Sequence, residues 1–343
     1  MKHSIKCYMK HIGVLLCLLF AFAAPVSAKV SASQIAVVVN VNDTDSRLIA
    51  AYYQKKRGIP KQNIIEVRFP AGQNSISEAT FNKFYQQVID KTPESVQFYA
   101  LAWTQPFKVE CMSVTSAFAF GFDKRYCAKG CKLTAVSDYY TSTSEYPKDE
   151  LGVRPAMMLA GSSLQQVYAM IDRGVAADGS KPEATAYLMN TSDKARNVRS
   201  HRYPIIQECL SDKINIEQID SDVLKNKDDV MFYFTGKTKV DAIDSNRYLP
   251  GAIADHLTST GGRLMGGRQM SVLRWLDAGA TASYGTVVEP CAFTQKFPYP
   301  GIVIEHYLNG ESLIEAYWKS VARPGQGVFV GEPLAAPYAD SVH

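Results

Sequence analysis

The sequence predicts an α/β fold in which a mostly parallel sheet carries helices on both faces. Continuous apolar stretches, typical of strands buried on both faces, alternate along the chain with amphipathic helical stretches. No low-complexity linker, charge block or internal repeat divides the 343 residues, and 46% of them are hydrophobic, which is ample for one large core. We therefore expect a single domain over residues 29–322.

The first hundred residues show this alternation most clearly. Residues 35–40 form an apolar run that predicts a strand, and Asp45-Ser46 begins a helix that Gly58 ends. The β-α-β-α-β order that results is typical of a parallel sheet. It continues with a strand over 63–69, an amphipathic helix over 77–91 and a strand over 97–103.

The alternation stops between residues 104 and 155. This segment contains three cysteines, a group of aromatic residues over 118–126 and a stretch rich in Ser, Thr and Tyr over 137–146. We interpret it as an insertion or long excursion, fastened by a disulfide, that lies over the edge of the sheet or over the site.

The alternation then resumes. Residues 250–259 are ambiguous, because Pro250 and Gly261 suit the two ends of a helix while 252–254 suits a short strand. Residues 323–343 are rich in Pro and Gly and are expected to form a tail. Strands are expected over 156–160, 184–191, 214–219, 229–235 and from 279, and helices over 164–173, 192–210, 270–278, 302–308 and 311–321.

Residues 1–28 have the pattern of a signal peptide. Three lysines precede an apolar run over 14–24 that is too short to span a bilayer comfortably, and small residues end at Ala28. An uncleaved N-terminal anchor is the alternative. Cleavage after Ala28 removes three lysines and no acid from a net charge of +4, and the near-neutral remainder argues against nucleic acid as a partner. We expect an exported protein, periplasmic or extracellular, without a membrane span.

Five cysteines follow the predicted signal: Cys111, Cys127, Cys131, Cys209 and Cys291. An oxidising compartment favours disulfides, and the sequence leaves their pairing open. A bridge within the short loop from Cys127 to Cys131 is one option. A zinc site at this pair would need two further ligands, and none is close in the sequence. We predict no metal and no cofactor.

Polar residues follow several predicted strands. Because the carboxyl ends of parallel strands meet at one edge of a sheet, we expect these residues to share a site there. The candidates for binding are Asp43, Asp193, Thr235 and Glu289. For Asp43 and Asp193 the alternative role is to cap a helix.

Cys291 and His256 are the candidate catalytic pair. Cys291 closes the run 279–291, which predicts a buried strand followed by Glu289-Pro290-Cys291. A thiolate is a strong nucleophile once a nearby imidazole lowers the pKa of the thiol. The alternatives are a disulfide for Cys291 and a structural role for His256.

Short motifs are spread over nearly all of the chain after the signal, at 42–46, 51–53, 57–60, 172–174, 249–252, 254–259, 284–291, 315–321 and 331–334. Together they resemble an uncharacterised exported bacterial family that co-occurs with exosortase, the PEP-CTERM protein-sorting system. The resemblance implies a setting in the cell envelope or in exopolysaccharide export, but no activity and no catalytic residues.

The order of elements also resembles, more faintly, that of gingipain-type cysteine peptidases, and this resemblance implies a caspase-like sheet. Those enzymes carry a His-Gly pair at the end of one strand and a Cys at the end of the next, whereas the strand over 229–235 ends here in Thr235-Gly236. Two classes of function therefore remain. One is a non-catalytic or degenerate peptidase-like scaffold that binds an envelope polymer or a sorted exported protein through aromatic residues of 104–155, such as Phe118, Phe120 and Tyr140. The other is a cysteine hydrolase that uses Cys291 and His256.

Overall fold

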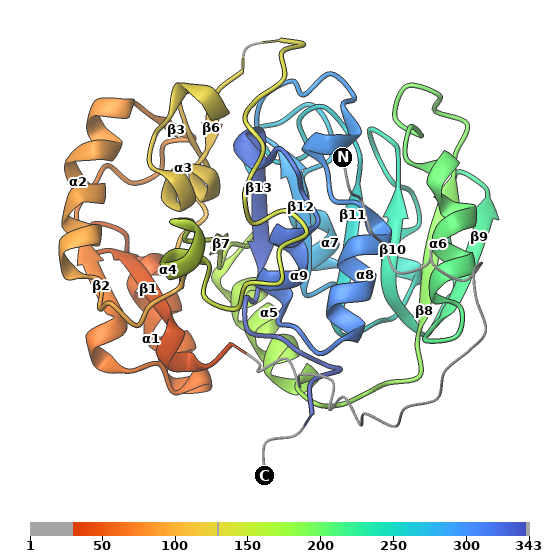
Figure 1. Cartoon of the computed structure of the whole chain (residues 1–343), viewed down its shortest axis with the longest axis horizontal. Helices are drawn as coiled ribbons and strands as arrows, with labels where there is room; N and C mark the ends of the chain where they lie inside the picture. The colour runs from red at the N-terminus through yellow and green to blue at the C-terminus, as the bar shows by residue number, and fades with distance from the viewer. Residues whose placement is uncertain (1–29, 129, 341–343) are drawn as a thin grey trace, which may run out of the picture.

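The computed structural model describes residues 30–128 and 130–340, so the predicted signal peptide lies outside the described residues. Its core is a ten-stranded sheet flanked by helices, which confirms the predicted α/β class (Figure 1). The strands follow one another across the sheet in the order β2 (Ile64–Val67), β1 (Ile35–Asn40), β4 (Phe98–Leu101), β7 (Ala156–Met158), β13 (Gly327–Gly331), β12 (Ala282–Thr286), β11 (Tyr248–His256), β10 (Val230–Thr235), β8 (Thr185–Asn190) and β9 (Asn215–Asp220).

Two groups of parallel strands meet at β13. Strands β2, β1, β4 and β7 are parallel neighbours, and so are β12, β11, β10, β8 and β9. Strand β13 lies between the groups and is antiparallel to β12, with Gly327 opposite Thr286 and Gly331 opposite Ala282.

The prediction of a Pro/Gly-rich tail over 323–343 is wrong in its central part, because β13 occupies the middle of the sheet and is fully buried. The strand is only five residues long, and Pro324 and Pro333 flank it. That composition is typical of a loop, and only the neighbouring strands turn it into sheet. The segment 250–259, ambiguous in sequence, is largely strand, as the span of β11 shows.

Helices cover both faces of the sheet, as predicted. On one face, α1 (Thr44–Arg57) packs against α5 (Leu164–Ala177), and α5 against α7 (Leu273–Asp277). On the other face, ring contacts join α2 to α3 and α3 to α9, while α8 contacts α9 and α6. The helices of this second layer are α2 (Glu78–Lys91), α3 (Val114–Phe120), α9 (Leu313–Lys319), α8 (Pro300–Leu308) and α6 (Tyr203–Leu210).

Local sequence accounts for the ends of several helices. Asp43 accepts a hydrogen bond from the backbone N–H of Asp45 and so caps α1, and Gly58 ends that helix with φ of 65°. Ser77 caps α2 in the same way. The helix predicted over 192–210 forms only from Tyr203, where Pro204 occupies the first turn.

The segment 104–155 is part of the core and not an appendage. Its strands β5 (Lys108–Val109) and β6 (Met112–Ser113) form a small second sheet with β3 (Ser75–Ile76), and it also contributes α3 and the short helix α4 (Pro147–Leu151). Phe118 of α3 is fully buried against Phe81 and Tyr99. A disulfide between Cys111 and Cys127 closes the segment, as expected for a fastened excursion.

Candidate functional site

The predicted site residues divide between two distant places. Asp193, Thr235, His256 and Glu289 end or follow β8, β10, β11 and β12, which are parallel neighbours, so they lie along one edge of the sheet. Asp43 follows β1, four strands away from β12, which corresponds to about 19 Å at ~4.8 Å per strand. Asp43 therefore caps α1 and takes no part in a shared pocket.

A small hollow lies at the edge formed by the ends of β11 and β12, and we call it the rim pocket. Its volume is about 170 Å³. Glu289 and Cys291, two of the candidates from the sequence, lie in its wall. The lining residues are Ala195, Arg196, Leu257, Thr258, Ser259, Glu289, Pro290, Cys291, Ala292 and Phe297.

Arg196 supplies the positive charge of the rim pocket. Nη1 of Arg196 donates to the carboxylate of Asp193 at 3.0 Å, and Nε of Arg196 donates to Oγ1 of Thr258 at 3.2 Å. Asp193 thus orients a pocket residue and does not itself line the pocket. No sequence motif marks Arg196, which belongs to a basic stretch that is equally compatible with a solvated surface.

Thr235 lies behind the pocket. Its side chain is buried, and its carbonyl oxygen accepts from Nη2 of Arg199 at 2.8 Å and from the backbone N–H of Leu257. Arg199 in turn pairs with the buried carboxylate of Asp255 at 2.6 Å. Thr235 is therefore a structural residue beneath the site, contrary to the binding role predicted for it.

Cys291 is not a thiol in this structure. Its sulfur is bonded to that of Cys131, and its backbone N–H donates to Oε1 of Glu289 at 2.8 Å. The short bridge between Cys127 and Cys131, one of the options in sequence, is not formed, because each of these cysteines pairs elsewhere. A disulfide-bonded sulfur cannot act as the nucleophile that the sequence suggested.

His256 also lacks the properties of a catalytic base. It is buried, its Nδ1 accepts the indole N–H of Trp275 at 2.9 Å, and its Nε2 lies 3.1 Å from the carbonyl oxygen of Met270. Burial lowers the pKa of His256 to about 4. Both ring nitrogens are therefore occupied by protein groups, and the pair predicted from Cys291 and His256 is not assembled.

A second, larger hollow adjoins the rim pocket, and we call it the outer groove. Its volume is about 520 Å³. Gln269 lines the outer groove, and Thr258 lines the rim pocket. The side-chain oxygen of Gln269 accepts a hydrogen bond from Oγ1 of Thr258 at 2.9 Å, so this hydrogen bond lies between the two hollows. No sequence motif marks this groove, whose lining combines residues 238–244 with residues 268–270 and Arg274.

Charged side chains surround the outer groove. Arg274 binds both carboxylate oxygens of Asp244, at 3.0 and 3.2 Å, so these charges are mutually compensated. Lys239 lies 3.8 Å from Asp241. Arg268 is exposed and forms no ion pair within the described part of the chain, so it carries the uncompensated charge of the groove.

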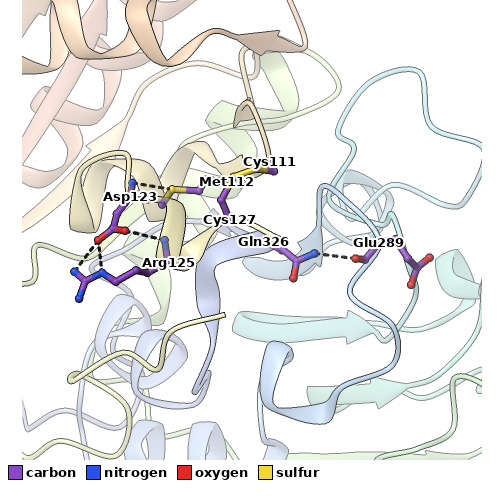
Figure 2. The surroundings of a disulfide bond; sticks show 7 residues. All are labelled: Cys111, Met112, Asp123, Arg125, Cys127, Glu289 and Gln326. Carbon is purple, nitrogen blue, oxygen red and sulfur yellow. Dashed lines mark hydrogen bonds and ion pairs between the residues drawn. A yellow bond between two sulfur atoms is a disulfide. The ribbon is translucent and has the colours of Figure 1, made fainter. Parts of the chain in front are cut away.

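The loop that carries Glu289 is held by the segment before β13. Nε2 of Gln326 donates to the carbonyl oxygen of Glu289 at 2.8 Å, and Figure 2 shows Gln326 extending toward Glu289 from the side of the Cys111–Cys127 bridge. On the far side of that bridge, Asp123 holds Arg125 at 2.7 Å (Figure 2). Both the C-terminal segment and the 104–155 segment therefore build this side of the site.

Within residues 30–128 and 130–340, no group of three or more His, Cys, Asp or Glu side chains is placed to hold a metal ion. Over the same residues, no helix has the length and apolar character needed to cross a membrane.

No protein-family model matches the sequence, and no curated protein matches it. The chain is similar to a solved structure described as "Structure of Protease", with a TM-score of 0.42 and 11% identity over 90% of this chain and 79% of that one. A similarity this weak carries no argument about what the present chain does.

Proposed function

We propose that this chain is an exported, non-catalytic protein of the cell envelope that binds an extended polar ligand along the rim pocket and the outer groove. The observation that carries the proposal is the disulfide of Cys291, because it removes the nucleophile while the rim pocket beside it remains. The resemblance to the exosortase-associated family supplies the setting, and the Cys111–Cys127 and Cys131–Cys291 disulfides agree with export.

The shape of the site supports a chain-like ligand. Thr258 lines the rim pocket, Gln269 lines the outer groove, and the two residues are joined by a hydrogen bond, so a polymer or an extended peptide that crosses this bond reaches both hollows. The floor of the groove includes buried Val240 and Ile243, which suits the apolar face of such a ligand. An envelope polymer or a sorted exported protein fits this description.

Arg268 and Lys239 provide the contact that is easiest to test. We expect the double substitution Arg268→Ala with Lys239→Ala to weaken co-sedimentation with isolated envelope material about tenfold, since both cations line the groove. Lys55→Ala with Lys83→Ala, on the exposed surfaces of α1 and α2, is the matched control. Equal co-sedimentation of the two double variants contradicts binding at the groove.

Chemical labelling tests the absence of catalysis. We expect native, unreduced protein to leave Cys291 unlabelled by iodoacetamide and to cleave no member of a fluorogenic peptide library. Labelling of Cys291 in the unreduced protein, slowed by His256→Ala, would instead support the alternative cysteine hydrolase.

A further inference from the structure

We propose that residues 131–134 form a strap that the Cys131–Cys291 disulfide locks over the side chain of Lys296, and that reduction of this bridge exposes Lys296 as an amine open to acylation. This modification site is independent of the ligand proposed above. The reagent class it accepts is an activated acyl compound, which transfers its acyl group to the amine and releases its leaving group and one proton.

Three contacts hold the strap to the C-terminal part of the chain. Cys131 is bonded to Cys291, 160 residues further along. Nζ of Lys296 donates to the carbonyl oxygen of Lys132 at 2.6 Å, and Arg323 donates to that of Thr134. The disulfide is the covalent contact among these three. The hydrogen bonds from Lys296 and Arg323 depend on it, because it keeps the carbonyl oxygens of Lys132 and Thr134 close to their donors.

The apolar side chains on the outward side of the strap contribute little to holding the strap against the rest of the protein. Leu133 is 57% exposed, and Val136, just beyond the strap, is 47% exposed. These apolar side chains gain little from burial in this position. Within the strap, Thr134 is buried while Cys131, Lys132 and Leu133 are exposed, so once the bridge is open the packing lost when the strap lifts away is mainly that of Thr134.

Lys296 depends on the strap for its hydrogen bond. The residue is fully buried, and its ammonium group lies over the ring of Phe293 at 5.2 Å. Burial lowers the pKa of Lys296 to about 8, with a smaller contribution from the nearby charge of Arg323, while Glu289 acts in the opposite direction. A lysine in this condition has a large neutral fraction near pH 8, and that neutral amine is the nucleophilic form.

The loop at the other end of the bridge is held in an uncommon conformation. Cys291 and Ala292 both have positive φ, 57° and 49°, although neither is glycine. Non-glycine residues are strained in this region, and the surrounding structure must maintain them. Opening the bridge removes one such restraint and favours release of the strap.

The redox step balances with an external dithiol. One of its thiolates attacks a sulfur of the bridge, and its second thiol then displaces the mixed disulfide. The protein gains two thiols, from two electrons and two protons, and the dithiol becomes a disulfide.

The test is a pulse of N-hydroxysuccinimide acetate at pH 8, with occupancy at Lys296 read by mass spectrometry. We expect at least tenfold faster acetylation of Lys296 in the full-length double variant Cys131→Ser with Cys291→Ser than in the unsubstituted protein. Cys111→Ser with Cys127→Ser removes the Cys111–Cys127 bridge and is the matched control, which should leave Lys296 protected. Equal protection in both double variants overturns the proposal, as does rapid acetylation in the unsubstituted protein.

A second measurement covers the case in which the serine variant does not fold. The unsubstituted protein is treated with a dithiol for increasing times, while acetylation and circular dichroism are followed together. The proposal requires Lys296 to become reactive, and amides 131–136 to exchange faster, before the circular dichroism changes. Acetylation that appears only with global unfolding contradicts it.

Discussion

Trp275 donates its indole N–H to Nδ1 of His256 at 2.9 Å, and both side chains are buried. Because an indole nitrogen only donates, Nδ1 carries no proton, and the proton lies on Nε2, which donates to the carbonyl oxygen of Met270. His256 is therefore held as one neutral tautomer. It connects the end of β11 to the segment that begins α7, and its chemistry is that of a structural link.

This arrangement predicts that His256 lowers stability in acid. Burial lowers the pKa of His256 to about 4 from an ordinary value of 6.5. The unfolded chain binds a proton below pH 6.5 while the folded chain does not, so stability falls as the pH decreases from 6.5 toward 4, by up to about 3 kcal/mol. Urea unfolding at several pH values should show a flatter dependence over this range for His256→Gln than for the unsubstituted protein.

His201 provides the control for that experiment, since it is exposed. His201→Gln should retain the pH dependence of the unsubstituted protein. If His256→Gln and His201→Gln give the same slope between pH 6.5 and 4, the role assigned to His256 is wrong.

Glu315 predicts the opposite pH dependence. It is fully buried in α9, its Oε2 accepts from the N–H and the hydroxyl of Ser312, and burial raises its pKa to about 7. The folded chain keeps this proton up to a higher pH than the unfolded chain, whose carboxyl titrates near 4.5. Stability is therefore lost as the pH rises from 4.5 through 7, by up to about 3 kcal/mol.

Glu315→Gln tests this directly, because the amide keeps an oxygen for Ser312 and does not titrate. We expect the variant to lose less stability than the unsubstituted protein between pH 5 and pH 8, as measured by urea unfolding. Glu305→Gln, a less buried change on α8, is the comparison. A steeper loss in Glu315→Gln than in the unsubstituted protein contradicts the prediction.

The sequence predicts most of the sheet because its strands are continuous apolar runs. The run over 35–40 is β1 and the run over 229–235 is β10, within a residue at each end. Strand β13 could not be predicted in this way. Its five residues are too few to show a hydrophobic periodicity, and they form a strand by pairing with β12.

The site was less predictable for a similar reason. Local sequence places Glu289 and Cys291 at a strand end, which is where they lie. The partner of Cys291 is 160 residues away, and no local pattern identifies it. The same holds for Arg196 and Arg268, which become site residues only when segments distant in sequence meet.

Phe118 tests the reassignment of the 104–155 segment from a binding surface to core. Its ring is fully buried against rings of α2 and β4. We expect Phe118→Ala to lower the free energy of unfolding by about 3–5 kcal/mol, the usual range for a buried phenylalanine. Tyr146→Ala, at a 48% exposed position in the same segment, should change it little. A Phe118→Ala variant of unchanged stability but weaker envelope association supports the original binding role instead.

The pair formed by Arg57 and Glu332 anchors the chain immediately after β13. Nε of Arg57 donates to Oε1 of Glu332 at 3.0 Å, its Nη2 donates to Oε2, and the hydroxyl of Tyr53 donates to Oε1 at 2.7 Å. Glu332 is fully buried, so removal of its charge leaves the Arg57 guanidinium with Asp178 as its one ion-pair partner within residues 30–128 and 130–340. Loss of one partner from a buried pair costs about 3–5 kcal/mol.

We therefore expect Glu332→Gln to lower the free energy of unfolding by an amount in that range, as measured by urea unfolding at pH 7. Lys181→Ala, which removes an exposed pair with Asp340 in the same C-terminal region, is the control and should have little effect. Because Glu332 follows β13 directly, hydrogen exchange should also quicken first in Gly327–Gly331 of the Glu332→Gln variant. Unchanged exchange in β13 together with full stability would show that the strand is held by its neighbours alone.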